Sequence, residues 1–521
     1  MIKQFSSLIL LFCTLICAIN SAHILGIYPL PGHSHYRLGS SLFRELAERG
    51  HDVTVISPFS EKDVPKNGTY RDIVLDGLFV GDEKHKGKQW NMFKREGLNP
   101  FVGTYVVATM ASKFIKMSLN HTKVQKLLHS DEKFDVVITD NFLSDAFKAF
   151  ATHFDAPLIV LNPVGPNFWI NPLVGNPSPP SYIPDILLNY YHPMTFSERM
   201  VNTLIYGFNF LLYNWLVYPQ HNEYVKQFIP RGGELKDILY NTSLVLLNSH
   251  PSLNQPVPLV PNMIEIGGFH MKPPKKLPED LQEFLDISKE GVVYFSMGSN
   301  LQSILWPIEK REVFLKTFAK LKMKVLWKWE DDELPGKPPN VKISKWVPQM
   351  DVLAHPNLKL FITHGGFVSS VETAYHGKPM LAIPIYGDQR NNANFAYKSG
   401  FGRYITFSNL TEKNLLEAIN EMLDNPKYSE NAKIRSKIFH DRQVHPMDTA
   451  VFWVEYVIRH RGAPHLRVAA LDLPWYKYLL VDVIVVLTLV LGSLIFITCF
   501  ILKKVWKKIC TKKNTKKVKT N

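Results

Sequence analysis

The stretch Trp346–Gln389 constrains the fold of this chain more strongly than any other. It alternates apolar runs of strand length with a glycine turn and a short helix-forming segment. A strand that runs through glycines into a helix N-terminus receives an anionic phosphate, because the first helical N–H groups have no partner inside the helix. The pattern therefore predicts an α/β fold with a nucleoside diphosphate site. In chain order the segments are a strand (358–363), His364-Gly365-Gly366, a helix (367–375), a strand (380–385) and Gly387-Asp388-Gln389.

Two further features place polar groups near this turn. Glu372 lies about a turn and a half into the helix, where a carboxylate can accept hydrogen bonds from ribose hydroxyls. Ser296, Gly298 and Ser299 form a second strand-to-turn corner of small residues, which is open to a phosphate. The helix of Glu372 and the Ser296–Ser299 corner each follow the C-terminal end of a predicted parallel strand, where open α/β sheets bind ligands.

An earlier βαβ unit indicates a second α/β domain, with strands at 23–28 and 53–57 and a helix at 36–49. His35 lies at its first turn, where the positive end of the helix should keep the imidazole neutral and basic. Asp140 ends the next apolar strand and can face the same rim, where a carboxylate would orient the histidine. The alternatives are that His35 is a solvated turn residue and that Asp140 caps the following helix.

The two ends of the chain predict a membrane protein. Residues 1–22 have the charge, apolar run and small residues of a cleaved signal peptide, with an N-terminal anchor as the alternative. Residues 483–502 carry no charge and are long enough to span a bilayer, although a buried core helix is possible. Nine lysines follow in 503–521, which predicts a cytosolic tail and a lumenal body. Lys517 and Lys519 form either a dilysine retrieval signal for the endoplasmic reticulum or part of a plain stop-transfer run.

Charge and cysteine content exclude several functions. The net charge is +14, but removing the tail lysines and Lys3 leaves +4, which does not favour nucleic acid as a partner. The four cysteines lie in the signal segment, the span and the tail, so the lumenal body has no disulfide, thiol nucleophile or cysteine metal site. Candidate N-glycosylation sites are Asn67, Asn120, Asn241 and Asn409, all on the predicted lumenal side.

An aromatic, proline-rich stretch (163–228) either lines a pocket for a lipophilic molecule, lies against the membrane, or packs in the core. The predicted division of the chain is a signal peptide (1–22), a first domain (23–249), a linker (250–284), a second domain (285–445), a helix and approach to the membrane (446–482), the span (483–502) and the tail (503–521).

The motifs W-x-P-Q, H-P, T-H-G-G, S-x-x-E, G-x-P and D-Q follow in this order within Trp346–Gln389. With the S-H at the first βα turn, D-V-V-I-T-D and F-S-M-G-S, they resemble the signature of the UDP-glycosyltransferases, the family that includes the UDP-glucuronosyltransferases. The resemblance covers essentially the whole chain and implies the GT-B fold, two Rossmann-like domains that face a cleft. The first domain would bind the acceptor and the second the UDP-sugar.

The resemblance also implies roles for individual residues. His35 would be the general base and Asp140 its orienting carboxylate. Donor binding would fall to Trp346 and Gln349 (uracil and nucleoside), to His364, Gly366, Ser369, Ser296, Gly298 and Ser299 (diphosphate), to Glu372 (ribose) and to Asp388 and Gln389 (sugar hydroxyls).

The implied activity is an inverting transfer of a hexose from a UDP-sugar to a hydroxyl of a small lipophilic acceptor, as in detoxification. No metal or other cofactor is expected, and the chain contains no Asp-x-Asp motif. Val368 stands where many members carry asparagine, a pattern that looks like the invertebrate branch and favours UDP-glucose. UDP-glucuronate as donor and a non-catalytic UDP-sugar-binding membrane protein are the alternatives. The expected partners are a UDP-sugar, an acceptor, membrane lipid and possibly a second copy of the chain.

Overall fold

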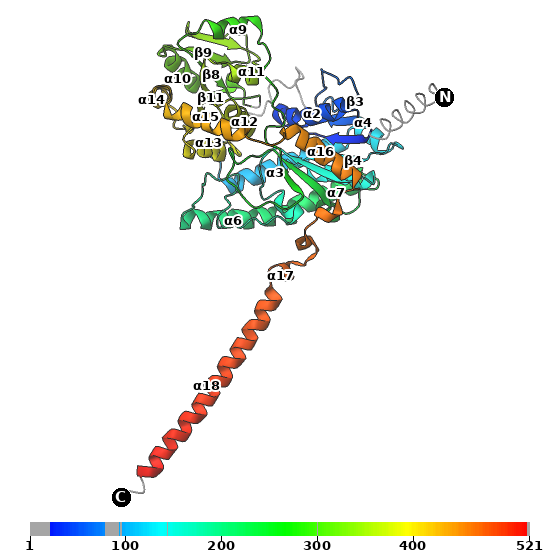
Figure 1. Ribbon diagram of the computed structural model, residues 1–521, viewed down its shortest axis with the longest axis vertical. Helices are drawn as coiled ribbons and strands as arrows, with labels where there is room; N and C mark the ends of the chain where they lie inside the picture. Colours follow the sequence, from blue (N-terminus) through cyan, green and yellow to red (C-terminus); the bar gives the residue numbers. More distant parts are fainter. Residues whose placement is uncertain (1–20, 79–92, 94–95, 143, 300, 518–521) are drawn as a thin grey trace, which may run out of the picture. The chain divides into compact units, whose positions relative to one another are not determined.

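The computed structural model describes residues 21–78, 93, 96–142, 144–299 and 301–517 (Figure 1). These residues divide into a compact body that ends at Arg467 and a C-terminal segment that starts at Val468. Nearly all of the predicted signal peptide and the tail residue Lys519 lie outside the described residues.

The first sheet of the body has seven parallel strands in the order β3-β2-β1-β4-β5-β6-β7. The chain builds outward from β1 on one side and then returns to continue from β4 on the other. This reversal between β1 and β4 is a topological switch point, where doubly wound sheets bind ligands beyond the strand ends. The strands are β1 (His23–Ile27), β2 (Asp52–Ser57), β3 (Thr69–Val74), β4 (Val136–Asp140), β5 (Leu158–Asn162), β6 (Thr242–Leu247) and β7 (Met263–Glu265).

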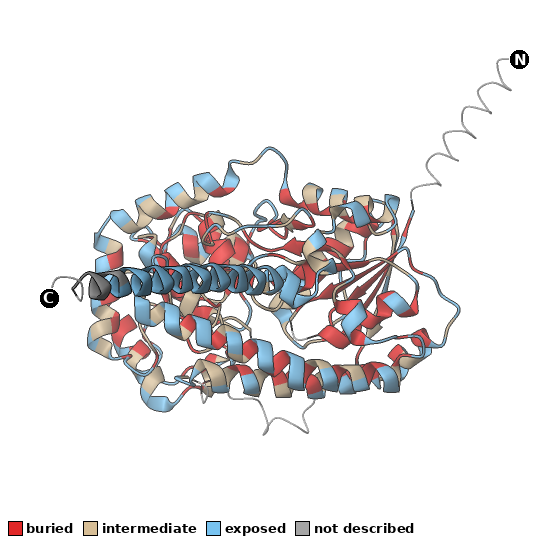
Figure 2. Ribbon diagram, turned by 90° about the horizontal axis from the view of Figure 1, so that it is seen from below, coloured by how far each residue is buried: buried red, intermediate tan, exposed pale blue. Residues whose placement is uncertain are grey.

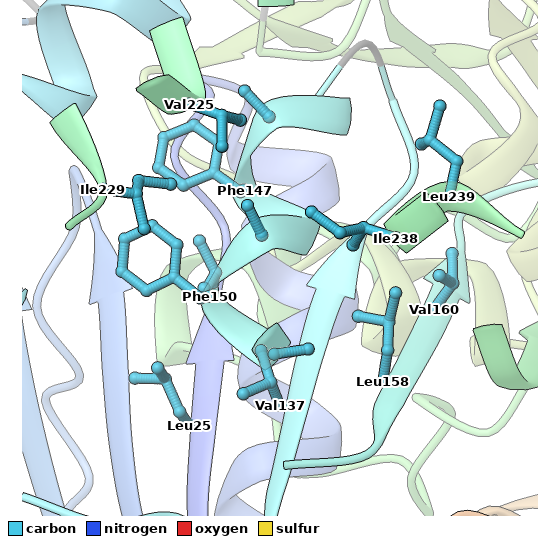
Figure 3. Packing of buried hydrophobic residues seen from close by; sticks show 14 of the residues in the cluster. Leu25, Val137, Phe147, Phe150, Leu158, Val160, Val225, Ile229, Ile238 and Leu239 are labelled. Atoms are coloured by element: carbon cyan, nitrogen blue, oxygen red, sulfur yellow. The ribbon is translucent and has the colours of Figure 1, made fainter. Parts of the chain in front are cut away.

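Both faces of this sheet are buried, as expected for parallel strands covered by helices. Along β1, Leu25 and Ile27 belong to the apolar cluster on one face, while Ile24 belongs to the cluster on the other. Figure 3 shows the first cluster, in which Phe147 and Phe150 lie over the sheet near Leu25 and Val137.

Helices cover both faces of the first sheet. They are α2 (His33–Glu48), α3 (Pro100–Leu119), α4 (Thr122–Leu128), a 3-10 turn (Asp145–Lys148), α5 (Ala149–His153), α6 (Phe196–Leu212), a π-helical turn (Tyr213–Val217), α7 (Tyr218–Phe228) and α8 (Leu235–Leu239). The late helix α16 (Pro446–Arg459) also packs here, because its apolar face joins the cluster beneath α2.

The second sheet has six parallel strands in the order β10-β9-β8-β11-β12-β13, so its switch point lies between β8 and β11. Its strands are β8 (Val292–Ser296), β9 (Lys324–Lys328), β10 (Val341–Ser344), β11 (Leu358–Thr363), β12 (Met380–Ala382) and β13 (Gly402–Tyr404). Its helices are α9 (Glu279–Asp286), α10 (Ile308–Ala319), α11 (Gln349–Ala354), α12 (Phe367–Tyr375), α13 (Gln389–Lys398), α14 (Glu412–Asp424) and α15 (Lys427–His440).

The region 250–284, expected to be a linker, contains two regular elements. β7 pairs with β6 and adds the last strand of the first sheet, and α9 packs against the second. A three-residue strand is too short to show periodicity, so sequence patterning missed it. Two boundaries also differ from expectation: α2 begins at His33 instead of Tyr36, and the strand expected to end at Ile385 ends at Ala382.

The C-terminal segment contains α17 (Trp475–Tyr478) and α18 (Val481–Lys517). Residues Val481–Thr511 of α18 are long and apolar enough to cross a membrane, and none of this helix is buried against other parts of the protein (Figure 2). The helix continues past the predicted end of the span at residue 502, because lysines are good helix formers.

Candidate active site

The switch point of the first sheet brings His35 and Asp140 together. His35 lies in the first turn of α2, and Asp140 is the last residue of β4, the strand beside β1. Nδ1 of His35 is 3.2 Å from Oδ2 of Asp140. The other carboxylate oxygen of Asp140 accepts a hydrogen bond from the backbone N–H of Phe142, so the acid also caps the loop after its strand. The carboxylate therefore fixes the His35 tautomer with Nδ1 protonated and leaves Nε2 free to accept a proton.

The electrostatic surroundings of His35 differ from the expectation of a simple helix-end effect. Burial lowers the pKa of His35, but the charge of Asp140, its hydrogen bond and the charge of Asp388 outweigh burial and raise the pKa above 6.5. The pKa of His35 is therefore shifted upward, whereas the positive end of α2 alone was expected to shift it downward. Two carboxylates stabilise the cation that forms when His35 accepts a proton.

Asp388 belongs to the second sheet, so its effect on His35 shows that the two switch points are near each other. It is the N-cap residue of α13, and its Oδ2 accepts a hydrogen bond from Nδ2 of Asn392 at 2.7 Å. Asn392 also donates to the carbonyl of Gly365 at 3.0 Å, which ties α13 to the glycine turn. Burial raises the pKa of Asp388, while Asn392 and His35 lower it.

The switch point of the second sheet forms the expected turn. Ser296 ends β8, and its hydroxyl accepts a hydrogen bond from the backbone N–H of Gly298 at 3.2 Å. His364 follows β11 directly and packs between two glycines. A Cβ on Gly298 would lie 2.9 Å from the His364 ring, and one on Gly366 would lie 2.3 Å from it. The glycines therefore allow the His364 ring to lie against the N-terminus of α12; Ser299 lies in the same turn after β8.

His364 is neutral at physiological pH, because burial lowers its pKa to about 4. Its Nδ1 lies 3.3 Å from the Thr363 hydroxyl. The second nitrogen and the free N–H groups at the start of α12 are hydrogen-bond donors of the kind that bind phosphate oxygens.

Glu372 is fully buried on α12, and both of its oxygens are engaged. Oε1 is 3.1 Å from Nη1 of Arg37, and Oε2 accepts from Nε2 of Gln349, which also lies 3.2 Å from the Ser369 hydroxyl. Burial raises the pKa of Glu372, and the Arg37 charge and the Gln349 hydrogen bond lower it. The structure thus places Gln349, Ser369 and Glu372 together, as the sequence predicts, and adds Arg37.

The last two predicted donor residues differ in what they contact. The ring of Trp346 is 69% exposed just before α11, so it is available as a stacking surface. The side-chain oxygen of Gln389 accepts hydrogen bonds from the backbone N–H groups of Ile385 and Tyr386 at 2.8 and 3.2 Å. That oxygen shapes the loop before α13 and is not free for a sugar hydroxyl.

Sequence reasoning missed Arg37 and Asn392. Asn392 follows Asp388 by one helical turn, a spacing that could have indicated the contact. No local signal identifies Arg37, because its partner Glu372 is 335 positions away in the chain. Val368 packs against the apolar cluster of the first sheet, so it faces hydrophobic side chains there. Among the described residues, no group of three or more His, Cys, Asp or Glu is placed to hold a metal ion.

Solved structures similar to this arrangement include glycosyltransferases. A UDP-glucose:anthocyanidin 3-O-glucosyltransferase in complex with UDP matches with a TM-score of 0.55 and 17% identity, covering 85% of this chain and 99% of that one. The glycosyltransferase VinC in complex with DTDP matches with a TM-score of 0.56 and 17% identity, over 84% and 100% of the two chains. At this identity the likeness concerns the fold, and the two parallel sheets with facing switch points define the GT-B class.

Relatives of higher identity narrow the class. The family model for UDP-glucoronosyl and UDP-glucosyl transferases matches residues 28–517. UDP-glycosyltransferase UGT5 of Dactylopius coccus is 39% identical over 96% of this chain and 97% of its own length. UDP-glucuronosyltransferase 2B19 of Macaca fascicularis is 33% identical over 93% and 94%. The chain therefore belongs to the UDP-glucuronosyl and UDP-glucosyl transferase family, and it is a UDP-sugar-dependent glycosyltransferase of the invertebrate-like kind.

Proposed function

We propose that this protein transfers glucose from UDP-glucose to a hydroxyl of a small lipophilic acceptor, with inversion to a β-glycoside. The observation that carries the proposal is the 3.2 Å contact of His35 with Asp140. The charge of Asp388, the N-cap residue of α13 in the second α/β half, also raises the pKa of His35. His35 can then act on the acceptor hydroxyl while the N-terminus of α12 binds the diphosphate of the UDP-sugar. UDP-glucuronate is the alternative donor, since curated relatives carry names of both kinds.

In this reaction Nε2 of His35 accepts the proton of the acceptor hydroxyl while the hydroxyl oxygen attacks the anomeric carbon. The new C–O bond forms as the bond from that carbon to the β-phosphate oxygen of UDP breaks on the opposite face. Asp140 stabilises the imidazolium that results. The N-terminus of α12 and neutral His364 donate hydrogen bonds to the departing diphosphate, so these protein groups supply the anion stabilisation that a metal would otherwise give.

The remaining donor contacts follow from the same geometry. Trp346 stacks on uracil, Gln349 and Glu372 bind the nucleoside, and Ser296, Gly298, Ser299, Gly366 and Ser369 surround the diphosphate. Asp388 binds sugar hydroxyls, since its charge acts on His35 and Asn392 links it to the glycine turn. Gln389 acts indirectly by holding the loop that positions Asp388.

The donor is tested with microsomes that contain the full chain, given UDP-glucose or UDP-glucuronate with a panel of phenols and steroids. We expect a glucoside from UDP-glucose and no product from UDP-glucuronate. Formation of a glucuronide instead would make UDP-glucuronate the donor. UDP binding without consumption of either donor would instead favour a non-catalytic UDP-sugar-binding protein.

We further propose a single-pass type I protein of the endoplasmic reticulum with its body in the lumen. The apolar helix α18 followed by lysines supports this topology. The four candidate glycosylation sites support it as well, since all are exposed on the body. Glycosidase-sensitive mass at Asn67, Asn120, Asn241 or Asn409 is the expected result, and a body digested by protease added to intact microsomes would contradict the topology.

Helix α6 supports membrane lipid as a partner of the body, because several large apolar side chains on it are exposed. Its inner side carries buried Asn202 and Asn209, which hydrogen-bond the segment around buried Asp185. Its exposed side mixes polar residues, such as Arg199 and Thr203, with large apolar ones. The large apolar residues exposed there and in the following π-helical turn are Phe196, Met200, Leu204, Phe210, Leu211, Trp215 and Leu216.

We take a bilayer as the partner of these apolar side chains, because the same chain carries a helix long and apolar enough to span one. Thirteen residues separate Arg467, at the end of the body, from Val481, where the apolar helix begins. Arg467 hydrogen-bonds the carbonyl of Tyr240, next to the α6–α8 region. With Cys499 and Cys510 replaced by serine, Leu204→Cys labelled with a polarity-sensitive dye should shift to the blue in vesicles. Lys316→Cys is the control on α10, and equal spectra at both positions would remove lipid as the partner.

A further inference from the structure

The ribose-binding carboxylate of the proposed donor site is occupied by a side chain of the protein itself. Glu372 has no exposed surface, because Arg37 covers one oxygen and Gln349 the other. A ribose diol needs carboxylate oxygens to accept its hydroxyl hydrogens. The diol therefore reaches Glu372 only if one of these two donors leaves.

Arg37 is the donor that can leave. Its side chain is 44% exposed, so the guanidinium is still in contact with solvent while it binds Glu372. Another nitrogen, Nη2, lies against the weak acceptor Sδ of Met350 on α11. Gln349, in contrast, is held at both ends of its amide: Nε2 lies near Ser369, and Oε1 accepts from the Tyr294 hydroxyl at 3.3 Å.

Arg37 also joins the two sheets at the catalytic helix. It lies on α2 two residues after His35, whereas Glu372 lies on α12 of the second sheet. Of the ion pairs between described residues, the Arg37–Glu372 pair alone connects the first 249 residues with the second-sheet residues 285–445. Occupancy of the ribose site is thereby linked to the helix that carries the base.

We propose that Arg37 competes with the ribose of the donor nucleotide for Glu372, and so acts as a positioning residue that weakens nucleotide binding and speeds release of UDP. The proposal rests on the proposed donor site at α12. When ribose binds, the guanidinium gives up Glu372 to the diol. When UDP leaves after transfer, Arg37 returns to the buried carboxylate and restores its charge balance.

The competition predicts a specific pattern of affinities. Calorimetry on the full chain in detergent compares UDP with a UDP analogue that lacks the 2′ and 3′ hydroxyls, at a pH of about 8 to keep Glu372 ionised. In Arg37→Met, UDP should bind about tenfold more tightly, the size of one charge-assisted hydrogen bond that is partly exposed to solvent. The analogue should change less than about twofold, because it does not use Glu372.

Two further variants control for charge and folding. Arg44→Met removes an arginine of the same helix whose partners Glu61 and Asp63 lie in the first half of the chain, at 3.7 and 3.8 Å, so both affinities should stay unchanged. In Arg37→Lys the ratio of UDP affinity to analogue affinity should return close to the wild-type ratio, because the ammonium keeps the charge. If Arg37→Met does not fold, the wild type is measured in buffers of rising ionic strength. Salt screens the Arg37–Glu372 pair, so the affinity for UDP should increase relative to the affinity for the analogue.

Product inhibition by UDP, KM and kcat distinguish competition for Glu372 from a purely structural role of Arg37. Product inhibition by UDP should strengthen about tenfold in Arg37→Met, with KM and kcat for the donor both falling, because release of UDP slows. Equal weakening of UDP and its analogue would overturn the proposal and make Arg37 a diphosphate ligand. No change in either affinity would also overturn it, while a wild type that binds no UDP would refute the donor site itself.

Discussion

His35 and His364 lie at the switch points of the two sheets, yet their surroundings set their protonation in opposite directions. His35 is near Asp140 and Asp388, whose charges raise its pKa above 6.5 in spite of burial. His364 is half-buried between glycines, and desolvation alone lowers its pKa to about 4. The comparison teaches that residue type and sheet position do not set the chemical role. Nearby carboxylates raise the pKa of one histidine, which fits its proposed role as base, and burial lowers the pKa of the other, which fits its proposed role as a neutral donor.

His35→Ala gives the largest expected effect. Without the base, turnover should fall by roughly 10²–10⁴, the usual contribution of a general base, while UDP affinity stays within about twofold. Turnover is measured with the donor and acceptor established in microsomes, and UDP affinity by calorimetry. Retained turnover would show that His35 is not the base, and the proposed difference in role between His35 and His364 would then be wrong.

Asp140→Asn should separate the two causes acting on His35. The rate should fall by about 10²-fold, because the imidazolium loses its stabilising charge. In the wild type only neutral His35 acts as base, so kcat/KM should rise with pH through a pKa above 6.5. In Asp140→Asn burial remains while the raising charge is lost, so this rise should move to lower pH. An unchanged pH profile would show that Asp140 does not control the protonation of His35.

His364→Gln tests the other histidine of the pair. A hydrogen bond to a charged group contributes about 1.5–3 kcal/mol, so UDP should bind roughly 10- to 100-fold more weakly. Since the His364 pKa is near 4, the variant should leave the pH profile between 5.5 and 8 unchanged. A shift of that profile would mean that His364, like His35, changes its charge during turnover.

Val368→Asn has the smallest expected effect. Val368 packs on the apolar cluster of the first sheet, so an asparagine there loses packing and does not gain a sugar contact directly. The ratio of kcat/KM values for UDP-glucose and UDP-glucuronate should change less than about threefold. A change of tenfold or more would show that this position sets donor choice, as the departure from the family pattern first suggested.

Much of the site could be predicted from local sequence. The order of strand, glycine turn and helix in 358–375 placed His364, Gly366 and Glu372 correctly, because each element depends on neighbouring residues. The strand ends placed Asp140 and His35 at the same rim, but their contact depends on the pairing of β4 with β1. The short strand β7 and the attachment of α16 to the first sheet could not be predicted, since both depend on partners far away in the chain.

The sequence by itself determined the two α/β sheets, the family and the apolar C-terminal helix, because periodicity, glycine turns and motif spacing are local properties. Only the tertiary structure decided the directions of the pKa shifts of the two histidines, the engagement of Gln389 with its own loop and the pairing of Arg37 with Glu372. Burial and long-range charge contacts exist only after distant segments meet, and a pKa depends on both. The functional difference between the two switch points is therefore a property of the folded chain.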